Sequence, residues 1–288
     1  MTANKLDKKN IEDILSLTAM QEGILFHYRS NPESRQYFEQ LSMRIAGNLD
    51  ADIFKKAWNF TAQNNEVLRT VFRWEKLEKP VQVVLRNYEI PVRVYDISEY
   101  EEEEILRQLE AIKEKDRKEG IDISTEPFRI TLCKLKKDRY EVILSNHHIL
   151  YDGWSNSVIL KEFLEAYDAF EKGQQPLRTA KNRYREFVKW HQGRDINTQK
   201  SYWTKYLEGM ESRTLLPWDS KKQGEIKKAQ VYTLEIEKEK AHRIKNFARE
   251  QKVALASVLY AAWGILLQRY NNSEDVILVL RYRAERQK

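Results

Sequence analysis

Residues Ser145–Ser155 read SNHHILYDGWS and place two adjacent histidines, an aspartate and a glycine in one short segment. An apolar run typical of a strand, Arg139–Leu144, precedes it, and a long apolar-periodic stretch that predicts a helix follows it. Ser155 or Ser157 is the expected N-cap of that helix. Because a strand end holds its side chains rigidly beside a cleft, we expect a functional site here.

Three kinds of site fit these residues. In acyl transfer, one imidazole takes a proton from an attacking amine or hydroxyl, since histidine titrates near neutral pH. In a metal site, His147, His148 and Asp152 would be ligands, although no further cluster of ligand residues stands at suitable spacing. In a structural site, the two imidazoles are hydrogen-bonded within the loop. The residues alone leave all three open.

Strand and helix patterns alternate along the rest of the chain. Asp50 is the expected cap of a helix that runs to about Asn64, and Gly173–Pro176 is the expected end of the long helix after the histidines. Further strands are predicted at Phe38–Ile45, Leu68–Trp74, Val81–Leu85, Phe128–Leu135 and Val231–Ile236, and further helices at Leu17–Asn31, Tyr100–Lys118 and Leu255–Tyr270. This mixture predicts an α/β (α+β) layered fold.

The composition narrows the class of protein. With 288 residues, 41% hydrophobic and 33% charged, the chain is neither disordered nor a disulfide scaffold. Its only cysteine, Cys133, indicates a reducing, cytoplasmic setting. The net charge of +6 is spread among glutamates, so we expect no nucleic-acid partner. No apolar run approaches the roughly 18 residues of a membrane span, so we expect no membrane association.

The segment His147–Gly153, HHILYDG, resembles the HHxxxDG motif of condensation domains from non-ribosomal peptide synthetases. Leu17–His27 resembles the first motif of that family, of the type LTPMQEGMLFH. Asn65–Phe72 resembles the second, RHExLRTxF, although Asn64–Asn65 stands where the family has Arg-His. Stretches similar to the later family segments follow in order at Tyr184–Trp190, Tyr202–Leu207 and Ala261–Asp275.

The resemblance implies two lobes, each similar to chloramphenicol acetyltransferase, with a tunnel between them. The implied reaction joins a carrier-bound donor acyl or peptidyl thioester to the amine of a carrier-bound acceptor aminoacyl thioester. No cofactor is then bound directly, because the phosphopantetheine arms belong to the partner carrier proteins. Adjacent synthetase modules are the other implied partners.

The motif positions imply a role for each residue. His148 is the expected active-site histidine, as a base or as a group that orients the amine and stabilises charge, and His147 supports the loop. Asp152 is expected to be structural and paired with Arg69, the only arginine left in the second motif. Gly153 is expected to permit a tight turn, with its backbone amide facing the oxyanion. Trp154 and Ser155 are expected to pack or to cap.

The end of the chain departs from the family. The family continues as FGTxxSGR, whereas Leu278–Lys288 reads LVLRYRAERQK. One permitted set of codons for Ile277–Lys288, with a single T inserted, encodes IFGTSVSGRAAE. We therefore expect a complete N-terminal lobe at 1–175, a partial C-terminal lobe at 176–277 and a frameshifted tail at 278–288. The consequence would be weak or no condensation by this chain alone.

Three other functions fit the same motif. A stand-alone HxxxD acyltransferase would use acyl-coenzyme A without a carrier. An epimerisation domain would exchange the α-proton of a carrier-bound peptide. A non-catalytic remnant would only dock a carrier protein.

Overall fold

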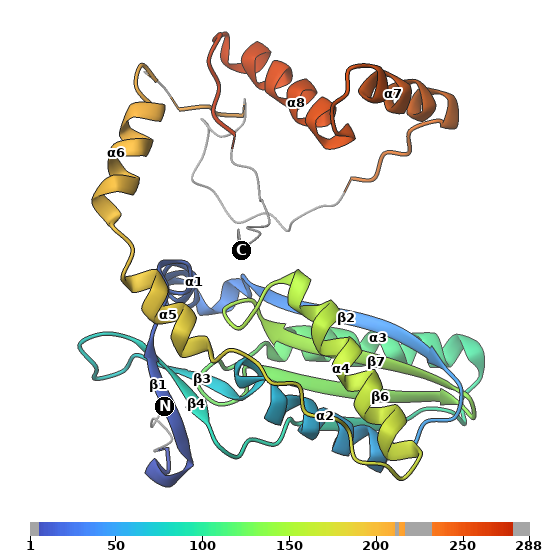
Figure 1. Ribbon diagram of the computed structural model, residues 1–288. Coiled ribbons are helices and arrows are strands. Elements are labelled where there is room, and N and C mark those ends of the chain that lie inside the picture. Colours follow the sequence, from blue (N-terminus) through green and yellow to red (C-terminus); the bar gives the residue numbers. More distant parts are fainter. Residues whose placement is uncertain (1–5, 211–212, 217–231, 279–288) are drawn as a thin grey trace. The chain divides into compact units, whose positions relative to one another are not determined.

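The computed structural model describes residues 6–210, 213–216 and 232–278 (Figure 1). The chain divides into two compact units, Met1–Arg194 and Asp195–Lys288. The tail expected at 278–288 lies outside the described residues, apart from Leu278.

The lobe boundary expected at 175/176 stays a prediction, and the two compact units divide at 194/195. The division falls there because the helix α5 (Tyr184–Gln192) packs on the first unit. Its Val188 is buried in one cluster with Leu15 and Val84.

All the described strands belong to the first unit and form two sheets. A three-stranded antiparallel sheet has the order β1-β4-β3, and a four-stranded sheet has the order β2-β7-β6-β5, in which only β5 and β6 are parallel. The strands are β1 (Ile11–Ser16), β2 (Phe38–Ala46), β3 (Thr70–Arg73), β4 (Val81–Leu85), β5 (Val92–Asp96), β6 (Phe128–Lys136) and β7 (Arg139–His147).

Helices cover both faces of the four-stranded sheet (Figure 1). Those of the first unit, besides α5, are α1 (Ala19–Ser30), α2 (Ala51–Asn64), α3 (Glu102–Glu119) and α4 (Gly153–Glu171), with short 3-10 turns η1 (Lys8–Asn10), η2 (Pro32–Ser34) and η3 (Glu66–Arg69). The predicted α/β class is confirmed.

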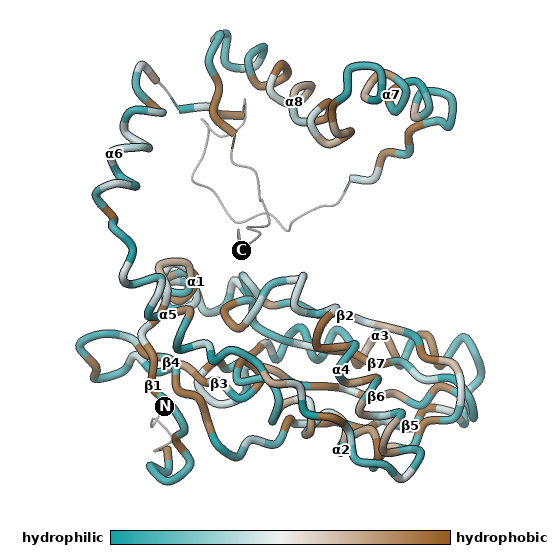
Figure 2. The backbone as a smooth tube through the Cα atoms, in the orientation of Figure 1, coloured by the Kyte–Doolittle hydropathy of each residue, from teal (hydrophilic) through white to brown (hydrophobic). Residues whose placement is uncertain are grey.

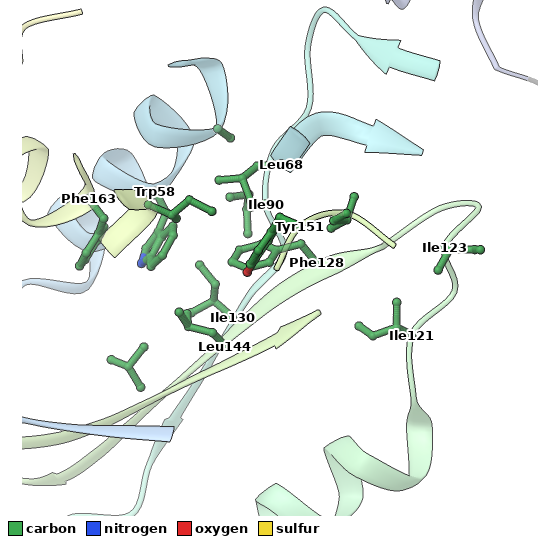
Figure 3. Close-up of a cluster of buried hydrophobic side chains, with 14 of the residues drawn as sticks. Trp58, Leu68, Ile90, Ile121, Ile123, Phe128, Ile130, Leu144, Tyr151 and Phe163 are labelled. Carbon is green, nitrogen blue, oxygen red and sulfur yellow. The ribbon is translucent and has the colours of Figure 1, made fainter. Parts of the chain in front are cut away.

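Side-chain alternation along β6 separates two cores. Ile130 and Leu132 face the larger core with α2 and α4, whereas Cys133 and Leu135 face the smaller core with α3. Figure 3 shows the larger core, in which Trp58 lies against Phe163. Cys133 is buried, and this burial raises the pKa of its thiol to about 12. The thiol is therefore protonated and unreactive near neutral pH.

Local capping explains where several helices begin. Asp50 accepts from the N–H groups of Asp52 and Ile53, which confirms the predicted start of α2. Thr18 and Gln21 form a capping box at α1. Gln21 is itself buried, and its amide also donates to the Ile149 carbonyl at 3.2 Å, so the start of α1 is tied to the histidine segment.

The second unit contains three described helices, α6 (Ile196–Tyr206), α7 (Lys238–Glu250) and α8 (Leu255–Asn271). Figure 2 colours several turns of α8 as hydrophobic, and Leu259 and Trp263 are 51% and 45% exposed. The strand expected at Val231–Ile236 is not formed over 232–236, and Val231 lies outside the described residues. A strand needs a hydrogen-bonding neighbour, and the described part of this unit offers no other strand.

Within the described residues, no single helix is long and apolar enough to cross a membrane. The helices α7 and α8, bent by 103° at their junction, meet the length and apolarity criteria only as a pair.

Candidate active site

The histidine segment begins at the last residue of β7 and ends at the first turn of α4. His147 is the last residue of β7 and pairs with Phe38, the first residue of β2. The N–H of His148 donates to the Tyr37 carbonyl at 2.8 Å, just beyond that pair. The three residues that follow, Ile149, Leu150 and Tyr151, are at most 8% exposed and belong to the larger core. Two strands and a buried loop therefore fix the backbone of both histidines.

His147 is an internal residue. It is 2% exposed, its ring packs edge-on against Tyr28, and its Nδ1 accepts from the N–H of Ile149 at 3.3 Å. Its Nε2 is buried without a hydrogen-bond partner, and the residue lines a pocket of about 20 Å³. Burial, with a smaller contribution from the neighbouring His148, lowers the pKa of His147 to about 4. The ring is therefore neutral at physiological pH.

This shift makes the stability of the first unit depend on pH. Because the pKa of His147 falls from 6.5 in the unfolded chain to about 4 in the folded one, the unfolded chain binds the proton more tightly between these pH values. We expect the contribution of His147 to be constant above pH ~6.5 and to fall by about 3 kcal/mol as the pH drops to ~4. The measurement is urea unfolding at a series of pH values.

The matched variant is His147→Asn, whose Oδ1 can replace Nδ1 as acceptor for the N–H of Ile149. All other titrating groups are common to both proteins, so their effects cancel in the difference between the two unfolding free energies. A difference that does not change between pH ~6.5 and ~4 would contradict the burial of a neutral imidazole.

His148 is more accessible than its neighbour. Its side chain is 17% exposed and its ring is stacked on Tyr37, with the planes 14° apart. Its Nδ1 lies 2.8 Å from Oε1 of Glu39, although the contact is outside the angular limits of a hydrogen bond. Of the two adjacent histidines, His148 is therefore the one that a substrate can reach.

Asp152 caps α4. Its Oδ1 accepts from the backbone N–H and from the hydroxyl of Ser155, both at 3.2 Å. The expectation that Ser155 or Ser157 caps this helix is therefore wrong. Asp152 directly precedes the first helical residue, and its exposed carboxylate accepts from the third N–H of the helix. Trp154, in the first turn, is 60% exposed and is not a core residue.

Gly153 is the first residue of α4 and is not among the residues with positive φ. A Cβ added there would meet nothing within 4 Å. The backbone of a helix start suits any residue, so the turn itself does not require glycine.

The cap is testable by two substitutions of one side chain. Asp152→Ala is expected to lower the free energy of unfolding by about 0.5–2 kcal/mol, because the N–H and the hydroxyl of Ser155 lose the carboxylate that caps the helix, although the N–H keeps the Asp152 carbonyl. Asp152→Asn keeps an acceptor oxygen and removes the charge, so its expected loss is a few tenths of a kcal/mol. Urea unfolding of both variants checks this. An equal, large loss in both would show that the charge matters, as in an ion pair.

Arg69 is not paired with Asp152. Its buried guanidinium lies 2.5 Å from the Glu12 carboxylate and also donates to the Leu85 carbonyl. The motif spacing could not predict this ion pair, because Glu12 lies on β1, 57 residues away along the chain. Arg69 therefore holds η3 against the three-stranded sheet.

Glu39 and Tyr37 are the functional candidates that sequence reasoning missed. Phe38–Ile45 reads as a strand, but only the register with β7 shows that its first residues lie beside His147 and His148. The sequence offers no clear signal for Glu39, because Gln40, Ser42 and Arg44 in the same strand are polar too.

Two further features bear on the type of site. A pocket of about 510 Å³, lined by η3 and residues 178–184, includes Arg69 and Leu150 but neither histidine, so it does not mark the chemistry of the motif. Across residues 6–210, 213–216 and 232–278, no three His, Cys, Asp or Glu side chains gather as a metal site.

Comparison with known families gives one match over most of the chain. The sequence model described as "Condensation domain" matches residues 11–285.

Several curated relatives match over nearly the whole chain. Surfactin synthase subunit 2 of Bacillus subtilis (strain 168) is 34% identical over 94% of this chain and 8% of that protein. Tyrocidine synthase 2 of Brevibacillus parabrevis is 32% identical over 94% of this chain and 8% of that protein. The chain thus spans less than a tenth of the length of these relatives.

The fold is similar to a solved structure of the first condensation domain of the calcium-dependent antibiotic synthetase, in complex with substrate analogue 2a. The TM-score is 0.70 at 20% identity, over 92% of this chain and 63% of that chain. At this identity the likeness concerns the fold.

Proposed function

The chain belongs to the condensation-domain family of non-ribosomal peptide synthetases, and we propose that it joins a carrier-bound donor acyl or peptidyl thioester to the amine of a carrier-bound acceptor. The observation that carries the proposal is the position of His148, partly exposed at a rigid strand end next to a buried, neutral His147. Acyl transfer needs one imidazole that reaches the amine, and this arrangement supplies it.

The proposed reaction is an aminolysis. The acceptor amine attacks the donor carbonyl carbon, a C–N bond forms, the C–S bond breaks, and the proton lost by the amine ends on the thiolate of the donor arm. His148 either takes this proton or holds the amine and stabilises the developing charge. An α-ammonium group has an ordinary pKa near 7.7–8.0, so positioning is a substantial part of the task. The backbone N–H of Gly153, at the start of α4, is the proposed oxyanion donor.

Condensation domains work with carrier domains that bear phosphopantetheine. In the proposal, one carrier presents the donor and a second presents the acceptor, and neighbouring synthetase modules supply both. Asp152 and Arg69 act indirectly, the first by starting α4 and the second by fixing η3.

The test follows the acceptor carrier by mass spectrometry after one turnover. The full chain is mixed with a donor carrier that bears an acyl group and an acceptor carrier that bears an amino acid. We expect the acceptor to gain the acyl mass only when both loaded carriers are present. A chimera, in which Met1–Arg194 replaces the matching segment of surfactin synthase subunit 2, is assayed in parallel and tests the first unit within a relative of this chain.

Each rival function gives a different result. Acyl gain from free acyl-coenzyme A, without a donor carrier, indicates a stand-alone acyltransferase. Exchange of an α-proton without amide formation indicates epimerisation. Carrier binding without product, in both the chain and a folded chimera, indicates a docking remnant and contradicts the proposal.

A further inference from the structure

We propose that Glu39 is a positioning residue that fixes the tautomer of His148 and so presents Nε2 to the acceptor amine. The inference rests on the proposed function for its chemical meaning, but its geometry stands alone. Oε1 of Glu39 lies 2.8 Å from Nδ1 of His148.

The Glu39 carboxylate is held from its other side. Oε2 accepts from the side-chain amide of Asn146 at 3.2 Å, and Glu39 and Asn146 face each other in the β2–β7 register. Asn146 is 2% exposed, so the anchoring donor is a fixed part of the sheet. One oxygen is therefore anchored to β7 while the other faces the histidine.

Tyr37 restrains His148 in two further ways. The backbone N–H of His148 donates to the Tyr37 carbonyl, and the Tyr37 ring is stacked on the imidazole. Tyr37 has φ of 66°, an uncommon value for a residue other than glycine. Such strained backbone is concentrated at functional sites. Here it lies directly next to His148.

The chemistry of the two groups decides the tautomer. An ionised carboxylate only accepts hydrogen bonds, so a neutral imidazole must turn a protonated Nδ1 toward it. The lone pair then lies on Nε2, which is the nitrogen able to accept a proton or a hydrogen bond from the amine. The present contact is misaligned for a hydrogen bond, as is common before substrate binds, and rotation of the ring would align it.

Glu39→Gln tests this with a sharp expectation. The Asn146 amide needs an acceptor, so the oxygen of the new glutamine faces Asn146 and its NH₂ group faces Nδ1 of His148. The NH₂ group donates, so Nδ1 must become the acceptor and the proton moves to Nε2. The tautomer is read by long-range ¹H–¹⁵N correlation spectra of the full chain labelled at histidine nitrogens. The pH is about two units above the ordinary histidine pKa of ~6.5, where free imidazole is neutral.

We expect wild-type His148 to carry its proton on Nδ1 and Glu39→Gln to carry it mainly on Nε2. A His148→Gln spectrum assigns the signals. Glu33→Gln, an exposed position in the turn before β2, is the matched control and should leave them unchanged. Glu39→Ala, which removes the acceptor without adding a donor, is expected to give a mixture. An identical tautomer in wild type, Glu39→Gln and Glu39→Ala overturns the inference.

The tautomer measurement needs no substrate, so it separates this inference from the proposed function. If the chain forms amide bonds, Glu39→Gln is also expected to lower the single-turnover rate by about tenfold or more, with little change in the concentration of carrier needed for half-maximal rate. If the tautomer changes but no amide forms in any variant, the positioning contact stands and the function fails. If amide forms at an unchanged rate and the tautomer is unchanged, only the positioning contact fails.

Discussion

Replacing His148 by alanine is expected to lower the single-turnover rate of amide formation by about 10²- to 10⁴-fold, the usual contribution of a positioned proton-transfer group. The protein should remain folded, because the backbone N–H that bonds the Tyr37 carbonyl is kept and the lost side chain is not a core residue. The measurement is the acyl gain of the acceptor carrier with both carriers loaded. Parallel urea unfolding shows that the variant is native.

The control is His242→Ala, an exposed histidine on α7 of the second unit. Its rate should stay within about twofold of wild type, because a surface substitution away from the site changes little. A His148→Ala protein that retains its rate would show that this histidine takes no part in the chemistry and would contradict the proposed role of the motif.

The pH dependence of the same variant separates the two roles of His148. Above pH ~8 an α-amine is mostly free of its extra proton, so a base is no longer needed to remove it. A group that only orients the amine is needed at every pH. We expect the loss in His148→Ala to persist at pH ~9. A loss that largely disappears there would assign His148 as the base.

The sequence predicts the framework well where the signal is local. Asp50 is a single cap candidate before an apolar-periodic run, and α2 begins and ends as expected. Val81–Leu85 is predicted to the residue, because apolar residues with high β-propensity fill it and turn residues bound it. Such elements depend on near neighbours, which the sequence contains.

Sequence reasoning fails where several local choices are equivalent. Asp152, Ser155 and Ser157 can all cap a helix, and only the path of the loop from buried Tyr151 selects Asp152. Val231–Ile236 has the composition of a strand, but β-structure needs a partner that the pattern does not specify.

Long-range partners are the other part that the sequence does not contain. Arg69 bonds Glu12 and Glu39 faces His148 because of sheet order and register. A register shift of one residue would turn Glu39 to the opposite face of β2. The motif therefore makes His148 a candidate, but the residue that we propose to orient it becomes visible only in the folded sheet.

The largest expected loss of stability comes from Trp58. Its side chain is fully buried, stacks on Phe163 of α4 with centroids 4.4 Å apart, and contacts Phe128 of β6. Trp58→Ala removes the group that joins α2, α4 and the sheet, and is expected to cost about 3–5 kcal/mol. Since a domain is stable by only about 5–15 kcal/mol, this is a large share of the total.

Hydrogen exchange of the β6 and β7 amides measures this loss, because buried strands exchange mainly when the first unit unfolds. Trp190→Ala is the control: this tryptophan is 56% exposed on α5 of the same unit, and its loss should cost less than about 1 kcal/mol. Trp58→Phe should fall between the two, since it keeps an aromatic ring against Phe163 and removes the unpartnered Nε1. If Trp58→Ala cost no more than Trp190→Ala, the three-element core that supports the histidine segment would be wrong.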